Sequence, residues 1–369
     1  MTAEEAAPSP SASHRIRDGG GWGAASTAVL GLLLVLLVAV AGAGASIAAP
    51  PAPLAVLVVF LPYLCALHGV LVFAAWTAFP DRRGLPVLMG ALAVVVVVLW
   101  APGPSRWRPV PDGLELRVQT WNLQRLWGAP DALACAEEGI EGEGADVVVL
   151  LEVSADDVSR LASDLGMGCA HHPYTSAGGS KAGGLAVCTR SERWAMSSGE
   201  GQRFVDDEDW YYLFSEIRST TAPDRVVNVL GVHLYPYRTG SALRRRTPLS
   251  AGDLMAIAGQ GEVVSRGQSD QVAALLQRVR RLSDPTVIAG DFNSTRDAAL
   301  HHELRRTLTD AWRAGGLGFG GTVRLLGLPL RVDHVYTTAD LGVRETRVPV
   351  LTCSDHRPVV ADVVLKAAP

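Results

Sequence analysis

The hydrophobic positions divide the chain into two parts with different patterns. Near the N-terminus, three long apolar runs without a charged residue predict helices over about 26–48, 54–79 and 85–101. Further along, short apolar runs alternate with polar turns and helical stretches, which is typical of an α/β domain. We therefore divide the chain into a segment 1–24, a transmembrane region 25–101, a linker 102–113 and a domain 114–369.

Within the domain, the pattern predicts strand, helix, strand and helix as far as Leu165, followed by several strands that end near Val232. A helix is expected over residues 268–282. Three strands then follow, and they carry Asp291, Asp333 and a tip with Asp355 and His356. Residues 338–349 are expected to form a surface connection.

The three N-terminal runs predict a multi-pass protein of the cell membrane. The first two are long enough to cross a bilayer and the third is at the lower end of the range, so a buried or interfacial helix is its alternative. Arg15 and Arg17 precede the first run, and Arg82 and Arg83 separate the second from the third. The positive-inside rule places both pairs in the cytoplasm and the domain outside. Segment 1–24, rich in Ala, Ser, Gly and Pro, is expected to be disordered and cytoplasmic.

The charge and the cysteines add little to this picture. The net charge is −4, so the chain lacks the basic excess expected for tight non-specific binding to nucleic acid. A loop with Arg244, Arg245 and Arg246 either grips an anionic substrate or faces solvent. An oxidising compartment could pair four domain cysteines in any of three ways, and four free thiols fit equally well. These are Cys135, Cys169, Cys188 and Cys353.

Several apolar strand patterns deliver a polar residue at or near their end. The clearest covers residues 287–293, where the alternation of side chains places Asp291 and Asn293 on one face. A carboxylate can orient a water molecule or a metal ion there, and a neutral amide can donate to a phosphoryl oxygen. Gly-Asp-x-Asn by itself also describes many turns. The other patterns lead to Asn122, Glu152, His233, Asp333 and the run Ser354, Asp355, His356.

In this order the motifs resemble those of the endonuclease/exonuclease/phosphatase superfamily, over about residues 114–365. Deoxyribonuclease I, abasic-site endonucleases, inositol phosphatases and neutral sphingomyelinases share its fold. The resemblance implies a four-layered α/β sandwich, in which two packed mixed β-sheets lie between helices and the site lies where strand ends meet.

The resemblance also implies roles for the polar residues. Asn122 would contact the scissile phosphate, and Glu152 would be the principal divalent-metal ligand. Asp291 would orient the attacking water, and Asn293 would bind a phosphate oxygen. The remaining members, expected to complete the site, are Asp333, Asp355 and His356.

The chemistry of these residues suits phosphodiester hydrolysis, which needs an oriented water and neutralisation of the phosphoryl charge. Glu152 and Asp355 are hard oxygen ligands of the kind that Mg²⁺ or Mn²⁺ accepts, and the closely spaced Cys and His ligands typical of zinc are missing. His356 is expected to be an imidazolium whose ring Asp333 holds in place.

Structural alternatives accompany these roles. Asn122 could cap a turn, Glu152 could cap the helix that begins near Ser154, and His233 could be an ordinary half-buried histidine at a strand end. His334 follows Asp333 on the same strand, so its side chain should point to the other face and be structural.

One region departs from the family pattern. In the deoxyribonuclease-like branch a glutamate supports the histidine equivalent to His233, whereas the corresponding region here holds Gly183 and Gly184 before an apolar strand. This resembles the phosphatase and sphingomyelinase branches, and it makes an acid partner for His233 doubtful.

Together these features predict a bacterial, membrane-tethered, divalent-metal-dependent phosphohydrolase with an extracytoplasmic site. It would cleave phosphodiester or phosphomonoester bonds by in-line attack of an oriented water. Nucleic acid and a phospholipid head group, as in a sphingomyelinase, both remain open as substrates. A catalytically silent binding or scaffold module is the alternative from another class, and the sequence indicates no protein partner.

Overall fold

The computed structural model describes residues 19–80, 84–100, 109, 112–124, 131–174, 183–205, 210–237, 251–325 and 327–367. By its contacts the chain separates into two compact units, Met1–Ala39 with Pro62–Leu99 and Val40–Leu61 with Trp100–Pro369. Most of segment 1–24 and of the linker 102–113 lie outside the described residues. So do Arg15, Arg17, Arg82, Arg83 and the three arginines Arg244, Arg245 and Arg246.

The N-terminal apolar runs form helices α1 (Gly19–Ser46), α2 (Ala52–Ala78) and α3 (Gly84–Trp100). Two stretches of the described residues, Trp22–Ser46 and Pro53–Ala78, are long and apolar enough to cross a membrane. The expected count of three such helices is therefore not met. At 17 residues, α3 is about 26 Å long, against about 30 Å for the hydrocarbon core.

Helix α1 also begins earlier than expected. The prediction placed its start near residue 26 and disorder before it, whereas the helix begins at Gly19. Four of the seven residues from Gly19 to Ala25 are glycine, which is a weak helix former, so local propensity does not predict this first part of the helix.

The remaining chain folds around two six-stranded mixed sheets, in the orders β13-β14-β1-β2-β4-β3 and β5-β6-β7-β8-β12-β9. The first sheet contains β1 (Gly113–Asn122), β2 (Val147–Val153), β3 (Met167–Pro173), β4 (Gly184–Arg190), β13 (Leu341–Arg347) and β14 (Val359–Lys366). The second contains β5 (Trp194–Arg203), β6 (Tyr211–Ser219), β7 (Val226–His233), β8 (Thr286–Asp291), β9 (Thr309–Asp310) and β12 (Asp333–Thr337). A small hairpin adds β10 (Val323–Leu325) and β11 (Leu328–Leu330).

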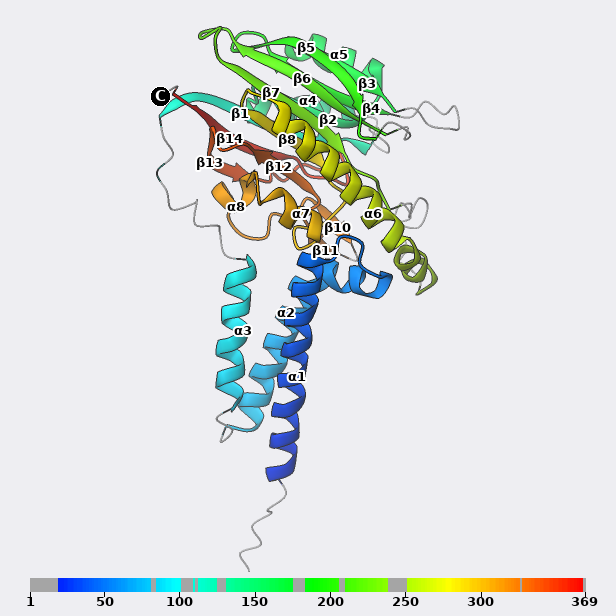
Figure 1. The fold of residues 1–369 in the computed structure, drawn as a ribbon, viewed down its shortest axis with the longest axis vertical. Coiled ribbons are helices and arrows are strands. Elements are labelled where there is room, and N and C mark those ends of the chain that lie inside the picture. Colours follow the sequence, from blue (N-terminus) through cyan, green and yellow to red (C-terminus); the bar gives the residue numbers. More distant parts are fainter. Residues whose placement is uncertain are drawn as a thin grey trace, which may run out of the picture. The chain divides into compact units, whose positions relative to one another are not determined.

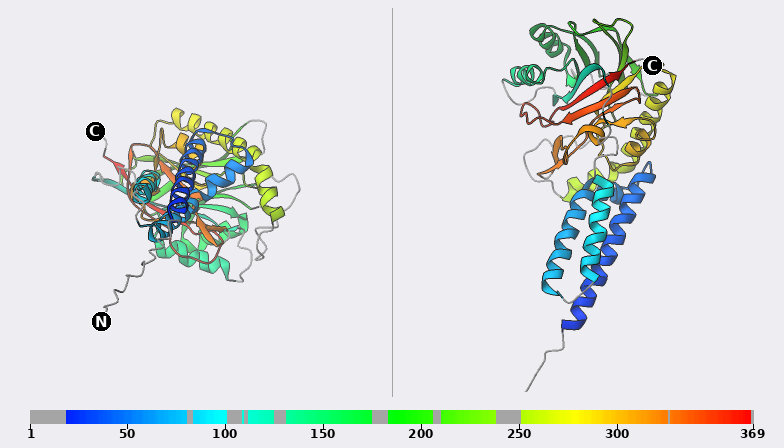
Figure 2. Two further views of the ribbon diagram at one scale, coloured as in Figure 1. Left: turned by 90° about the horizontal axis from the view of Figure 1, so that it is seen from below. Right: turned by 90° about the vertical axis from the view of Figure 1, so that its left-hand side faces the viewer.

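The sheets and helices form four layers (Figures 1 and 2). Alternate residues of β2 serve different interfaces: Val149 packs in the core between the sheets, whereas Leu150 packs in the outer cluster with α4 (Ala132–Glu143) and α5 (Ala155–Leu165). Apolar residues of α6 (Ala251–Arg281) and α7 (Ala299–Leu304) cover the outer face of the other sheet. A short helix, α8, spans Ala311–Gly315. The predicted four-layered sandwich is confirmed.

Three local predictions are wrong. Residues 338–349 are not a surface connection but contain β13, in which Leu341 and Val343 are buried while Arg344 and Glu345 are exposed after a bulge. Charged residues on an edge strand hide its alternation. The helix predicted over 268–282 begins at Ala251. The tip with Asp355 and His356 is a turn before β14 rather than part of a strand.

The four domain cysteines form the disulfides Cys135–Cys353 and Cys169–Cys188, which selects one of the three possible pairings. The second links partners in register on β3 and β4. The first joins α4 to the residue before Ser354, and so ties the turn that carries His356 to the outer helices.

Candidate active site

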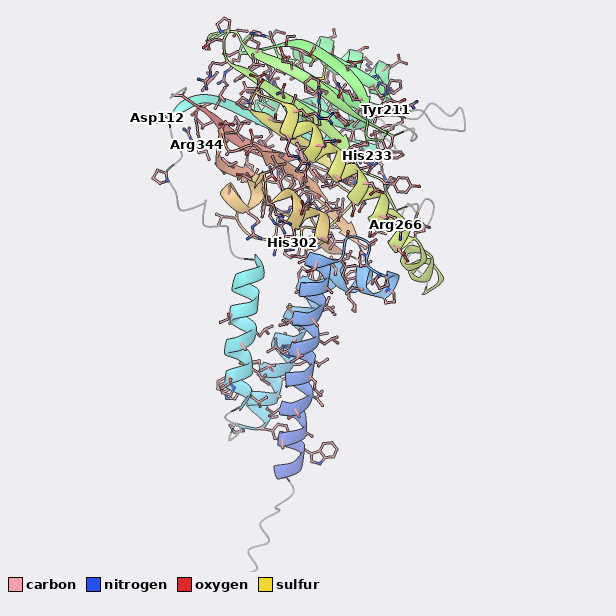
Figure 3. The ribbon with its side chains drawn as sticks, viewed as in Figure 1. Asp112, Tyr211, His233, Arg266, His302 and Arg344 are labelled. Carbon is pink, nitrogen blue, oxygen red and sulfur yellow. A yellow bond between two sulfur atoms is a disulfide. The ribbon has the colours of Figure 1, made fainter. Side chains whose placement is uncertain are left out.

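Three of the predicted residues lie side by side on adjacent strands. His233 at the end of β7 is the register partner of Asp291 at the end of β8, and Asp291 is in turn the partner of Asp333 at the start of β12. Figure 3 labels His233. A Cβ on Gly290, whose φ is 155°, would lie 1.8 Å from the Val232 carbonyl oxygen, so only glycine lets the strands approach here.

The other sheet contributes Asn122 at the end of β1 and Glu152 on the neighbouring parallel strand β2. At Glu152 the pairing with β4 slips by a bulge and φ is 55°; Asn293 also has a left-handed backbone, with φ of 47°. Such a conformation costs about 1–3 kcal/mol for a non-glycine residue and is found where a side chain must be aimed. A Cβ on Gly183 would lie 2.6 Å from the Glu152 backbone carbonyl carbon, so the glycine makes room for the bulge.

The side chain of Asn122 joins the two sheets. Its Nδ2 donates to Asp291 Oδ2 at 3.1 Å and lies 3.3 Å from Glu152 Oε1, and its Oδ1 accepts from the Gln124 backbone N–H at 2.9 Å. Asn122 therefore caps the turn after β1 through Oδ1 and also contacts the site carboxylates through Nδ2. Glu152 does not cap α5, because Ser154 is the N-cap and accepts from the Asp157 N–H.

The turn before β14 brings His356 to the same point. Its Nδ1 lies 2.9 Å from Asp333 Oδ2, and its Nε2 lies 3.9 Å from Asp291 Oδ2. Trp121 Nε1 donates to the His356 carbonyl at 3.0 Å, and Ser354 Oγ donates to the Asn122 carbonyl at 2.7 Å. Both anchors belong to β1, so the turn is held against the sheet that carries Asn122.

Burial makes the charges of this group strongly interdependent. The side chains of Asp291 and Asp333 are 1% and 0% exposed. Burial and the neighbouring Asp333 raise the pKa of Asp291 to about 6, against the influence of His356 and His233. Burial alone would lower the pKa of His356, but the carboxylates of Asp333 and Asp291 raise it to about 10. His356 is therefore an imidazolium at neutral pH, as expected.

His233 has a neighbour that sequence reasoning missed. Its Nε2 lies 3.7 Å from Asp291 Oδ2, and its Nδ1 lies 2.7 Å from the Tyr174 hydroxyl. Trp210 Nε1 donates to the His233 carbonyl at 2.6 Å. Tyr174 follows β3 directly, and no feature of its spacing in the sequence marks it. The Tyr174 hydroxyl thus lies beside His233 in a chain that has Gly183 and Gly184 in the region where the deoxyribonuclease-like branch has a glutamate.

Oxygen atoms suited to a divalent cation lie on both sides of Asn122. Asp291 and Asp333 offer carboxylate oxygens within 4.8 Å of each other, whereas the neighbouring His356 is protonated and has no free ring nitrogen for a metal ion. Asp333 Oδ1 is buried with no hydrogen-bond partner among the described residues. Glu152 is half-buried and reaches this group through Asn122, whereas Asp355 is exposed beside His356. Carboxylate and amide oxygens fit Mg²⁺ or Mn²⁺ by their chemistry.

Asn293 contacts the site through its backbone, whereas His334 faces away from it. The Asn293 backbone N–H donates to Asp291 Oδ1 at 2.8 Å, and its side-chain Nδ2 donates to the Leu234 carbonyl at 3.0 Å. His334 is buried on the opposite face of β12 from Asp333, as expected for a structural residue, and its ring lies 4.2 Å from that of His301.

Residues 120–356 match the model of the Endonuclease/Exonuclease/phosphatase family. The chain belongs to this family. Its members hydrolyse phosphoester bonds and depend on divalent metal ions. No curated protein sequence matches the chain.

Solved structures share the fold. The human Nocturnin catalytic domain with bound sulfate is 18% identical, with a TM-score of 0.52, and the match covers 71% of this chain and 98% of that one. A family member from Bacteroides vulgatus is 14% identical, with a TM-score of 0.52 over 69% of this chain and 100% of that one. One from Beutenbergia cavernae is 22% identical, with a TM-score of 0.50 over 69% and 72%.

Proposed function

We propose that this protein is a membrane-tethered, divalent-metal-dependent phosphodiesterase whose site lies outside the cytoplasm. The observation that carries the proposal is the group of Asp291, Asp333 and His356, joined through Asn122 to Glu152 at the strand ends of both sheets. A binding module has no need of buried carboxylates beside an imidazolium, whereas in-line attack on a phosphate ester does.

The residues divide the work by their charge and position. Asp291 lies among the donors of Asn122, Asn293 and the two histidines, where its carboxylate can hold a water and accept a proton from it. His356 keeps Nδ1–H on Asp333, which leaves Nε2–H to donate to a phosphoryl oxygen. Asn122 Nδ2 donates to Asp291 and Glu152 and so orients both carboxylates. Asn293 Nδ2 donates one N–H to the Leu234 carbonyl and keeps the other for a phosphoryl oxygen.

A divalent cation would be held by Glu152, with Asp355 as a second carboxylate, and would supply positive charge against the phosphoryl oxygens. Mg²⁺ is the proposed ion, with Mn²⁺ as a substitute. Glu152→Gln preserves the volume of the side chain but removes the anionic ligand. It should weaken Mg²⁺ binding by calorimetry and abolish turnover; unchanged turnover at saturating Mg²⁺ would contradict the assignment.

Two disulfides support the extracytoplasmic location, because such bonds persist in oxidising compartments. A cytoplasmic N-terminus and an outer domain need an odd number of crossings, so we propose that α3 crosses the membrane with α1 and α2. Asp340→Cys, at an exposed position, should react with an impermeant thiol reagent in intact cells, and Arg82→Cys should not. The reverse pattern would place the site in the cytoplasm.

Hydrolysis of bis-p-nitrophenyl phosphate, dependent on added metal ion and lost in chelator, tests the reaction itself. No turnover with any divalent ion would favour the catalytically silent module. A panel of DNA, RNA, phospholipid and inositol phosphate then compares the substrate classes. The net charge of −4 favours a small or lipid head group over tight binding of nucleic acid.

A further inference from the structure

A largely apolar pocket opens beside the candidate active site. Its volume is about 280 Å³, and it lies wholly within the compact unit formed by Val40–Leu61 and Trp100–Pro369. Asn293, Asp355 and His356 are part of its wall. The apolar part of the wall includes Ile47, Val56, Val59, Phe60, Leu325 and Leu330.

The segment between α1 and α2 forms one side of this pocket and is held in place by specific contacts. Ser269 Oγ donates to the Ala48 carbonyl at 3.1 Å. A Cβ on Gly44 would lie 2.6 Å from a methyl group of Val58 and 3.3 Å from the Asp297 carbonyl oxygen, so the chain passes closely here. The apolar wall therefore comes partly from the ends of the two helices that are long enough to cross a membrane.

One polar group on the wall has no protein partner. Thr295 is 8% exposed, and its Oγ1 is buried without a hydrogen-bond partner among the described residues. Thr295 lines the pocket together with Asn293. This oxygen is covered by protein atoms, so Thr295 offers no polar contact to a molecule bound in the pocket.

We propose that the pocket binds the hydrocarbon chain of a membrane lipid whose phosphate ester lies at His356. An apolar cavity larger than the ~150 Å³ that holds a benzene molecule is suited to a hydrocarbon chain. A nucleic acid would present sugars and charged phosphates to this wall, whose described residues include no basic side chain other than Arg324 and the His356 of the active site. The inference rests on the proposed phosphodiesterase function and names its substrate class.

The test compares diesters that share one reacting group and differ in chain length, namely ethyl, octyl and dodecyl p-nitrophenyl phosphate. The full-length protein in lipid nanodiscs is assayed with Mg²⁺. Val59→Trp fills the pocket, and Leu57→Trp is the matched control because Leu57 is exposed on the same helix and does not line the pocket. Val56→Trp repeats the test at a second lining position, in case one variant fails to fold.

We expect Val59→Trp to raise the KM for the dodecyl ester at least tenfold and to leave the KM for the ethyl ester within about twofold of the wild-type value. Leu57→Trp should not raise the KM for the dodecyl ester in this way. Equal effects of the two variants, or equal effects on short and long esters, would overturn the lipid assignment while hydrolysis itself survives. Failure of the wild type to hydrolyse any of the esters would instead count against the proposed function.

Binding gives a readout that does not require turnover. Dodecyl phosphonate should raise the Tm of the wild type and of Leu57→Trp, because a ligand stabilises the state that binds it. It should not raise the Tm of Val59→Trp. The same shift in all three proteins would show that the chain binds elsewhere and would overturn the proposal.

Discussion

The two faces of strand β12 lie against histidine clusters in opposite electrostatic states. On one face Asp333 contacts His356, whose pKa is raised to about 10. On the other face His334 packs against His301, and burial lowers the pKa of both rings well below the ordinary value. Both pairs are removed from bulk water. Charged partners, rather than burial itself, therefore decide whether a buried histidine is charged.

The partners explain the contrast. Two carboxylates face His356, whereas the rings of His301 and His334 meet the carbonyl oxygen of Ser294, at 3.0 and 3.3 Å, and His301 also lies 2.7 Å from the Tyr336 hydroxyl. Ser294 follows Asn293 directly. The neutral pair thus holds the backbone behind Asp291 and Asn293 in place, while the charged pair faces the reaction.

The largest expected effect comes from removing the charge of Asp333. Asp333→Asn keeps the shape of the side chain but removes one of the two carboxylates that raise the pKa of His356, and with it the anionic partner of Nδ1. We expect kcat for bis-p-nitrophenyl phosphate to fall by about 10²–10⁴, the range for loss of acid/base and electrostatic groups. His356→Ala should lower kcat by an amount in the same range. A kcat within about twofold of the wild type in either variant would mean that the charged pair is not part of the reaction.

A smaller effect is expected from Tyr174→Phe, which removes the hydroxyl beside His233. The ring should lose its fixed orientation toward Asp291, and kcat should fall by about tenfold, the effect of about one hydrogen bond to a reacting group. KM should stay unchanged, because Tyr174 acts through His233. Tyr211→Phe is the matched control: its hydroxyl accepts from Arg203 rather than from a site residue. If both tyrosine variants behave alike, Tyr174 is not a positioning residue.

Sequence reasoning found the residues that have a local signal. Asn122, Glu152 and Asp291 each end or interrupt a buried apolar strand, and a polar residue there is visible without knowledge of the fold. Periodicity alone predicted only an α/β domain, and the four layers came from the family resemblance. The alternation along β12 also predicted that His334 faces away from Asp333, because it depends on neighbours in the chain.

Features set by long-range contacts were not predictable. Tyr174 reaches His233 across 59 positions of sequence, and Cys135 pairs with Cys353 across 218. The backbone at Glu152 depends on a slip in register with β4, and no residue pattern marks it. Strand β13 was missed because exposed charges interrupt its apolar alternation.

The smallest expected effect is on stability, and its sign differs between the two faces of β12. For His301 and His334 the folded pKa lies below the ordinary value, so the unfolded chain takes up protons first as the pH falls below about 6.5. Their stabilising contribution is complete above that pH and is lost toward lower pH. For His356 the folded pKa is about 10, so its contribution is complete below about pH 6.5 and is lost as the pH rises through about 10.

Replacing one histidine on each side of β12, His334 or His356, should reveal these opposite signs. His334→Asn should be less stable than the wild type at pH 7.5, and the gap should narrow toward pH 5.5 by at most about 1.4 kcal/mol per pH unit, the limit for one proton. For His356→Asn the gap should narrow instead between pH 7.5 and 10. Thermal unfolding in chelator, where no metal ion competes for the site, measures both trends. Parallel trends in the two variants would contradict the contrast, because burial without regard to partners would then govern both faces.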